Sequence, residues 1–131
     1  ADTYERGLPV DIYGFWRDVL AQDAQSIRSY FTKDARIFWH CTNEQFTLEE
    51  FIIANCEYPG EWDGRVERVE QAQNALITVA RVYPKDRSLS FHVVSFFRLA
   101  GDKIETLDEY WADDGAPPVW RQERRIGQKI L

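Results

Sequence analysis

Residues 88–112 read SLSFHVVSFFRLAGDKIETLDEYWA, and this stretch decides the fold. A Gly101-Asp102 pair, which is typical of a hairpin turn, separates two runs whose side chains divide between two faces. The pattern therefore predicts two long antiparallel strands, over residues 88–99 and 103–112. Five side chains share the face of the first strand that we expect to point toward the core: Phe91, Val93, Ser95, Phe97 and Leu99.

The residues that precede this hairpin predict three helices and three further strands, with the helices mostly toward the N-terminus. The strand segments are rich in β-branched and aromatic residues, whereas the helical segments carry apolar residues three and four positions apart. Asp23 and Thr47 stand where helix N-caps are expected, and Thr47-Leu-Glu-Glu50 has the form of a capping box. The fold class is therefore α+β, with three N-terminal helices on one side of a long antiparallel sheet. Strands are predicted over residues 35–41, 64–73 and 75–83, and helices over residues 11–20, 23–31 and 47–56.

The composition is that of one globular domain. The chain has 131 residues, and we expect residues 1–131 to form a single domain. Hydrophobic residues make up 44% and charged residues 29%, a balance that excludes an intrinsically disordered chain. A net charge of −6 disfavours nucleic acid as a partner, because its phosphates are also negative. No apolar run approaches the ~18 residues of a membrane span, and no basic-then-apolar leader follows Ala1, which favours a cytoplasmic protein without a membrane partner.

The remaining polar and reactive residues predict neither a metal nor a cofactor. Cys41 and Cys56 lie in apolar contexts without metal-ligand spacing, so we expect reduced, buried thiols. The two histidines, His40 and His92, do not belong to a motif with metal-ligand spacing, so we expect no metal site. Four basic residues near the C-terminus are expected to form a solvated tail: Arg121, Arg124, Arg125 and Lys129.

Two segments resemble a known family, and the order of elements extends the likeness over almost the whole chain. YFTKDARI at residues 30–37 resembles the entry into the first strand of nuclear-transport-factor-2-like proteins, and FRLAGDKI at 97–104 with DEYW at 108–111 resembles their closing hairpin. The most similar branch is SnoaL-like. The resemblance implies a cystatin-like α+β roll, in which a curved sheet wraps around the helices and leaves a conical pocket. Because the superfamily includes ketosteroid isomerases, polyketide cyclases, limonene epoxide hydrolases, scytalone dehydratases and binding modules, this fold does not fix the function.

The resemblance makes Glu109 the first candidate for chemistry. In the similar epoxide hydrolases, the acid directly before an aromatic pair points into the pocket as an acid or a base, and Glu109 precedes Tyr110-Trp111. The pattern leaves the register undecided, so either Asp108 or Glu109 faces inward. Arg81 shares a strand face with apolar residues and is the expected partner of Glu109. Desolvation would raise the pKa of Glu109 and Arg81 would lower it, and the sequence leaves this balance open.

Other residues are candidates for contacts with a ligand. His40 would shuttle protons near neutral pH if a bulge or the pocket mouth turns it inward, because alternation places it opposite Trp39. Asn55 lies on the core-facing stripe of its helix, where it would orient a ligand carbonyl or bond nearby backbone. Tyr58 and Trp62 either close over the pocket or pack at its rim. The remaining candidate ligand-binding residues are Trp16, Trp39, Arg81, Phe97 and Trp111.

Two functional hypotheses follow. The first is binding of a small apolar or aromatic molecule, with or without cofactor-free acid–base catalysis of the isomerase, dehydratase or cyclase type by Glu109 and His40. The second is a non-catalytic ligand-binding or protein-interaction module. Aromatic residues make up 15% of the chain and either fill the core or line a cavity. Because the strand over residues 88–99 is apolar on both faces, we also expect Val94 and Phe96 to form an outward patch that pairs two copies as a homodimer.

Overall fold

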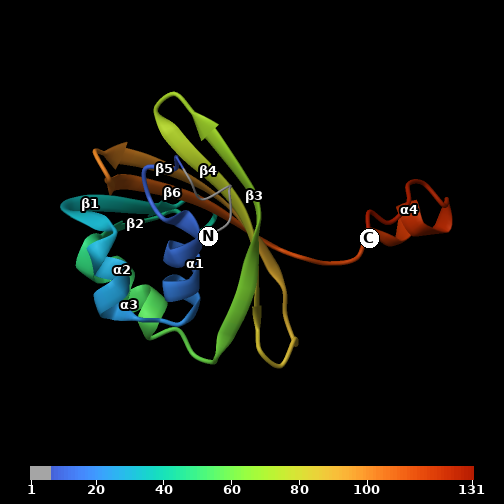
Figure 1. Ribbon diagram of the computed structural model, residues 1–131. Helices are drawn as coiled ribbons and strands as arrows, with labels where there is room; N and C mark the ends of the chain where they lie inside the picture. The colour runs from blue at the N-terminus through green and yellow to red at the C-terminus, as the bar shows by residue number, and fades with distance from the viewer. Residues whose placement is uncertain (1–6) are drawn as a thin grey trace.

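The computed structural model describes residues 7–131, so the expectation about a leader after Ala1 bears partly on residues outside the described range. Three helices lie on one side of a curved sheet of six strands (Figure 1), and the α+β class is as predicted. The helices are α1 (Ile12–Leu20), α2 (Ala24–Ser29) and α3 (Leu48–Cys56), with a short α4 (Val119–Glu123) near the C-terminus. The strands are β1 (Phe31–Trp39), β2 (Glu44–Thr47), β3 (Trp62–Ala72), β4 (Ala75–Pro84), β5 (Phe91–Ala100) and β6 (Lys103–Asp113), and a 3-10 turn, η1 (His40–Thr42), follows β1.

Side-chain caps begin the three N-terminal helices. Asp11 and Asp23 each accept a hydrogen bond from a backbone N–H in the first turn of α1 and α2. The predicted capping box opens α3, because Thr47 Oγ1 accepts from the Glu50 N–H at 3.2 Å and the Glu50 carboxylate accepts from the Thr47 N–H at 2.9 Å. These contacts satisfy backbone donors that have no partner inside the helix, which is why the starts were predictable from sequence.

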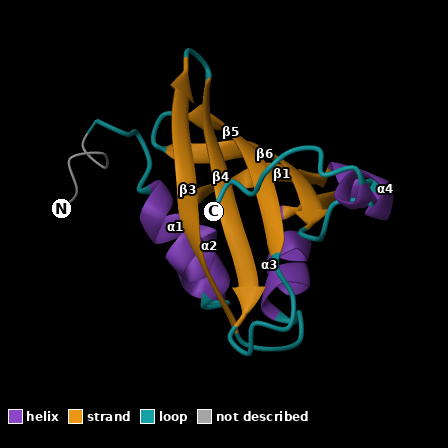
Figure 2. Cartoon of the chain, turned by 90° about the vertical axis from the view of Figure 1, so that its right-hand side faces the viewer, coloured by secondary structure: helices purple, strands orange, loops and turns teal. Residues whose placement is uncertain are grey.

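The sheet has the strand order β2-β1-β6-β5-β4-β3 (Figure 2). Strands β3 to β6 form the predicted antiparallel meander, with the turn of the β5–β6 hairpin at Gly101-Asp102. The sequence did not predict β2, nor that β1 pairs with β6 in parallel. A parallel pair joins segments that are far apart in the chain, so no local turn signal announces it.

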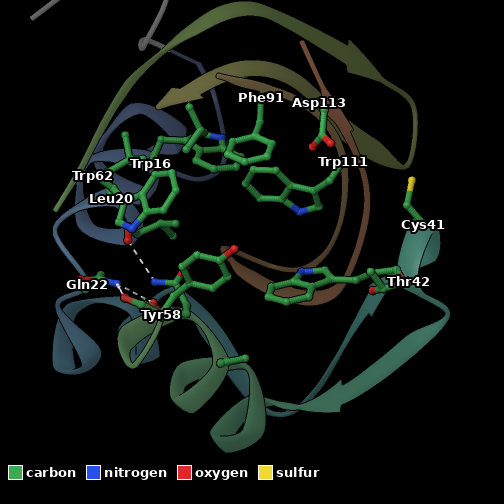
Figure 3. Close-up of a pocket in the computed structure, with 15 residues that line it drawn as sticks. Trp16, Leu20, Gln22, Cys41, Thr42, Tyr58, Trp62, Phe91, Trp111 and Asp113 are labelled. Atoms are coloured by element: carbon green, nitrogen blue, oxygen red, sulfur yellow. Dashed lines mark hydrogen bonds between the residues drawn. The ribbon is translucent and has the colours of Figure 1, made fainter. Parts of the chain in front are cut away.

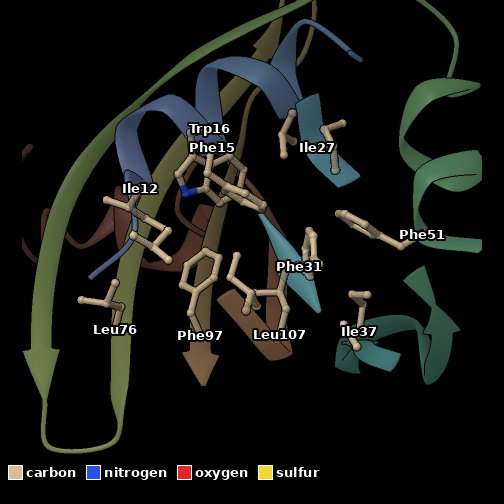
Figure 4. Packing of buried hydrophobic residues seen from close by; sticks show 14 of the residues in the cluster. Ile12, Phe15, Trp16, Ile27, Phe31, Ile37, Phe51, Leu76, Phe97 and Leu107 are labelled. Atoms are coloured by element: carbon tan, nitrogen blue, oxygen red, sulfur yellow. The ribbon is translucent and has the colours of Figure 1, made fainter. Parts of the chain in front are cut away.

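The core lies between the helices and the concave face of the sheet (Figure 4). The ring of Phe97, on β5, packs edge-on against Phe15 of α1 with their centroids 5.3 Å apart, and Phe97 is 0% exposed. Phe97, predicted to contact a ligand, is therefore part of the core and does not line the cavity described below. It lies under the middle of α1, where the helix fills the space that a ligand would need.

The C-terminal arm, residues 115–131, extends away from the sheet (Figure 1). Its four basic side chains are exposed, as predicted, and so are apolar residues such as Trp120 on α4, which is 56% exposed. Within residues 7–131, no helix is both long enough and apolar enough to cross a membrane. Cys41 and Cys56 are both free, but Cys41 is exposed rather than buried, because it lies in η1 beyond the end of β1.

Candidate functional site

A cavity of about 450 Å³ opens between one end of the curved sheet and the C-terminal ends of α1 and α3 (Figure 3). Six of its fifteen lining residues are aromatic, with rings from α1, from β1, from the segment after α3 and from β3, β5 and β6. The polar lining groups are few, which gives the cavity an apolar interior. The six aromatic residues of the wall are Trp16, Trp39, Tyr58, Trp62, Phe91 and Trp111.

Two amide side chains hold the helical side of the cavity together. Asn55, on α3, donates from Nδ2 to the Val19 carbonyl of α1 at 3.0 Å. Gln22, just after α1, donates from Nε2 to the carbonyls of Asn55 and Tyr58 at 2.9 and 2.8 Å. Asn55 lines the cavity, but of its two predicted roles the structure shows the bond to backbone. The sequence analysis did not identify Gln22 as a site residue, because a single glutamine in a turn belongs to no recognisable motif.

Tyr58 and Trp62 form the rim. The Trp62 indole N–H donates to the Pro59 carbonyl at 3.0 Å, which fixes the ring across the turn that ends α3. The Tyr58 and Trp62 rings meet edge to face with centroids 5.5 Å apart, and Trp62 also contacts Phe91 at 6.1 Å. Since all three rings line the cavity, this segment closes one side of its mouth.

A row of buried polar side chains crosses the sheet behind the aromatic wall. Thr78, Ser95 and Glu109 are the buried polar residues of the described range, and they occupy paired positions on β4, β5 and β6. The Trp16 indole N–H donates to Thr78 Oγ1 at 3.2 Å, and the Trp39 indole N–H donates to Glu109 Oε1 at 3.1 Å. We call Thr78, Ser95 and Glu109 the polar row. It anchors two of the rings that line the cavity.

Glu109 is the ionisable member of the polar row, and the structure resolves the register: Glu109 faces inward and Asp108 outward. Glu109 is 2% exposed, and burial raises the pKa of its carboxyl to about 7. Hydrogen bonds oppose the rise in pKa, chiefly the 2.6 Å bond that Ser95 Oγ donates to Glu109 Oε2. The nearby Trp111 N–H also lowers the pKa of Glu109, although this buried nitrogen does not form a complete hydrogen bond. Desolvation therefore outweighs the groups that favour the ionised carboxylate.

Arg81 is not the partner of Glu109, and the prediction that placed it on the core face is wrong. The inner face of β4 carries Ala80 and Val82, both buried, so Arg81 between them points to the other side of the sheet. There its Nε donates to Ser90 Oγ at 3.1 Å, and it does not line the aromatic cavity. Both faces of β4 carry apolar residues, so alternation could not decide which one the helices cover.

His40 does not reach the cavity either, which corrects its prediction as an inward proton shuttle. Its ring stacks on Tyr110 on the outer face, with centroids 4.5 Å apart and planes at 8°, and its Nε2 lies 2.7 Å from Asp108 Oδ1. His92 also has a carboxylate partner, Asp114, so both histidines have carboxylate neighbours that the sequence spacing did not reveal. In the part of the chain that the structure describes, no group of three His, Cys, Asp or Glu is placed to hold a metal ion.

The structure thus brings together most of the predicted site residues and separates three of them from the cavity. The predicted Trp16, Trp39, Asn55, Tyr58, Trp62 and Trp111 all line it, with Glu109 behind, whereas Arg81, His40 and Phe97 lie elsewhere. Sequence reasoning missed Phe91 and Asp113, which face each other across the β5–β6 pair at the mouth. It also missed Thr78 and Ser95, since a small hydroxyl side chain on a core-facing strand gives no sequence signal of a functional site.

No family model matches the chain, and neither does any curated protein. Solved structures share its fold. An NTF2-like protein of unknown function from Burkholderia xenovorans LB400 is 19% identical, with a TM-score of 0.75 over 92% of each chain. A candidate ketosteroid isomerase from Kribbella flavida DSM 17836 is 15% identical, with a TM-score of 0.74 over 90% of this chain and 85% of its own. An LEH-like epoxide hydrolase from M. tuberculosis is 11% identical, with a TM-score of 0.64 over 77% of this chain and 79% of its own. The chain therefore has the NTF2-like fold that its sequence resemblance implied.

Proposed function

We propose that the chain binds a small apolar or aromatic molecule in the aromatic cavity. The observation that carries this proposal is the convergence of six aromatic rings, from separate elements, on one space of about 450 Å³. That volume lies within the roughly 300–1,000 Å³ of typical small-molecule sites. Two of the rings, those of Trp16 and Trp39, donate hydrogen bonds to the polar row, which fixes the orientation of these two rings without a ligand. The activities named for two structural neighbours, ketosteroid isomerase and epoxide hydrolase, also act on small molecules, which supports this class of function.

Acid–base catalysis by Glu109 is the second candidate, and one observation favours it. A carboxyl with a pKa of about 7 exchanges protons readily near neutral pH. However, Glu109 is not part of the cavity wall, and its two oxygens already accept from Trp39 and Ser95. Its neighbours Trp39 and Trp111 line the cavity, whereas the carboxyl itself does not. The geometry therefore supports binding better than catalysis, with Glu109 positioning the Trp39 ring.

The test of binding uses 2-naphthol as an uncharged aromatic probe in isothermal titration calorimetry. We expect Trp111→Leu to weaken binding about tenfold, because it removes one ring of the wall and a contact worth roughly 1.4 kcal/mol. Trp120→Leu is the matched control, since Trp120 lies on α4 in the arm and does not line the cavity. Equal affinities of the two variants would show that the probe does not bind in the cavity.

We also propose that two copies pair through the outer face of the sheet. Phe96 and Tyr110 are 37% and 43% exposed there, and their rings contact edge to face with centroids 6.1 Å apart. On this face Ile77 lies in register with Phe96, and Val94 lies between Val79 and Tyr110. Asp108, opposite Phe96 on β6, borders the patch and pairs with His40. The three N-terminal helices lie on the opposite side of the sheet and leave this patch uncovered (Figure 1).

The charge of the arm supports pairing with a second copy. The arm, residues 115–131, carries four basic side chains and one acidic one, a formal charge of +3, so the rest of the chain carries −9. The arm extends away from its own sheet with Trp120 exposed. An acidic body of a second copy is complementary to this basic arm, which offsets the repulsion between two bodies of like charge.

Phe96→Glu is expected to convert the dimer into a monomer of 15.4 kDa, because it places a charge in the centre of the apolar patch. Light scattering at micromolar concentration measures the mass. Gln71→Glu adds the same charge at an exposed position of β3 and should leave the dimer intact. A wild-type mass of 15.4 kDa at every concentration would contradict the pairing.

A further inference from the structure

We propose that the aromatic cavity selects a cationic amine, that is, a small molecule that carries an alkylammonium group on an apolar body. This inference rests on the proposed function and names the ligand class for the same cavity. Three observations support it: the predominance of tryptophan among the rings of the wall, the formal charge of the lining residues, and the carboxyl groups of Asp113 at the mouth and Glu109 behind the wall.

Tryptophan predominates among the aromatic residues of the wall. Four of its six rings are Trp, the aromatic side chain that attracts a cation most strongly, because its π face is the most negative. The rings come from different elements of the fold: Trp16 from α1, Trp39 from β1 and Trp111 from β6. An ammonium group bound in the cavity would lie among these rings, with aliphatic side chains such as Leu20 and Val82 completing the wall. Purely apolar ligands need no such excess of tryptophan.

The lining residues of the cavity carry a negative formal charge. Among those that the structure describes, none is Lys, Arg or His, and Asp113 carries the formal charge at the mouth. Asp113 faces Phe91 in the β5–β6 register and lies two residues after Trp111 on the same strand. Within residues 7–131 no ion pair involves Asp113, although Asp113 also lines an adjacent hollow together with Arg81 and Arg87. It is the acidic residue of the aromatic cavity that a cation entering between these rings would meet.

Glu109 adds a second acidic group behind the wall. Trp39 of β1, Ser95 of β5 and Trp111 of its own strand act on its carboxyl, and Thr78 of β4 and Trp16 of α1 complete the surroundings along the polar row. None of these neighbours is charged. A cation among the rings would favour the ionised Glu109, and that carboxylate would then be a stronger acceptor for the Trp111 N–H, which has no partner. Cation binding and ionisation of Glu109 therefore support each other.

The test compares two probes of nearly the same shape, phenyltrimethylammonium and its uncharged isostere tert-butylbenzene, by calorimetry at pH 8. We expect the cation to bind about tenfold more tightly, even though a purely apolar cavity would prefer the hydrocarbon. Asp113→Asn should weaken binding of the cation several-fold without changing that of tert-butylbenzene. Asp102→Asn is the matched control, because it removes the same charge at the hairpin turn, at the other end of β6. From pH 6 to pH 8 the affinity for the cation should rise in the wild type and stay constant in Glu109→Gln.

Each outcome of the test has a distinct meaning. If tert-butylbenzene binds as tightly as the cation or more tightly, the amine preference is overturned and the small-molecule cavity stands. If neither probe binds, and 2-naphthol does not bind either, both the amine preference and the proposed function fail. If Asp113→Asn and Asp102→Asn weaken cation binding equally, the preference reflects the overall charge of the chain and not the cavity mouth.

Discussion

Glu109→Gln is expected to abolish the part of the wild-type pH dependence that comes from Glu109, a fall in stability as the pH rises from 4.5 to 7. In the folded protein the pKa of Glu109 is raised from 4.5 to about 7 because the carboxyl is buried without a charged partner. Between these values the folded state holds a proton that the unfolded state has released, so the free energy of unfolding decreases with rising pH. The glutamine amide stays neutral at every pH and has no such dependence.

The sign and size of this effect follow from the two pKa values. Below pH 4.5 both states are protonated, and above pH 7 both are ionised, so the effect is complete at pH 8. A shift from 4.5 to about 7 corresponds to about 3 kcal/mol, at 1.36 kcal/mol for each pH unit. The variant should therefore be more stable than the wild type at pH 8, by up to about 3 kcal/mol, and similar to it at pH 4.5.

Urea unfolding from pH 4.5 to pH 8 measures the difference. Glu105→Gln is the matched control, because Glu105 is exposed on the same strand and its loss should leave the pH dependence of the wild type unchanged. A Glu109→Gln curve parallel to the wild-type curve would show that Glu109 is ionised throughout and that its carboxylate is stabilised by its neighbours.

Phe97→Ala is expected to destabilise the protein by about 3–5 kcal/mol. Phe97 is fully buried on the inner face of β5, and its ring packs against Phe15 of α1. Truncation removes the burial of the ring and leaves a void that close-packed neighbours fill only in part. The loss is a large part of the 5–15 kcal/mol that a domain of this kind has in total.

The adjacent residue provides the control for this prediction. Phe96 lies on the outer face of the same strand, and Phe96→Ala should cost no more than about 1 kcal/mol in the monomer. Urea unfolding at a protein concentration below that of dimer formation measures both variants. Similar losses for the two would mean that the inner face of β5 does not form the closed core, and would restore Phe97 as a candidate for contact with a ligand.

Local signals in the sequence determined the elements of the fold. Three of these signals each involve four residues or fewer: the Thr47–Glu50 capping box, the Asp23 cap and the turn at Gly101-Asp102. Residues close in sequence therefore determine their geometry. The inner face of β5 was predictable for a similar reason, since Val93 and Phe97 lie two residues from Ser95 on a strand whose side chains alternate. Most aromatic residues of the wall were predicted because the family resemblance implied a conical pocket, which large aromatic side chains often line.

Only the tertiary structure decided how these elements face one another. Arg81 was expected on the core face and lies on the outer one, because both faces of β4 are apolar and only the position of α1 settles which is covered. The parallel pairing of β1 with β6 places Trp39 beside Glu109, two residues that are 70 positions apart in the chain. The high pKa of Glu109 follows from that burial, and burial is a property of all the elements that surround a group rather than of its neighbours in sequence.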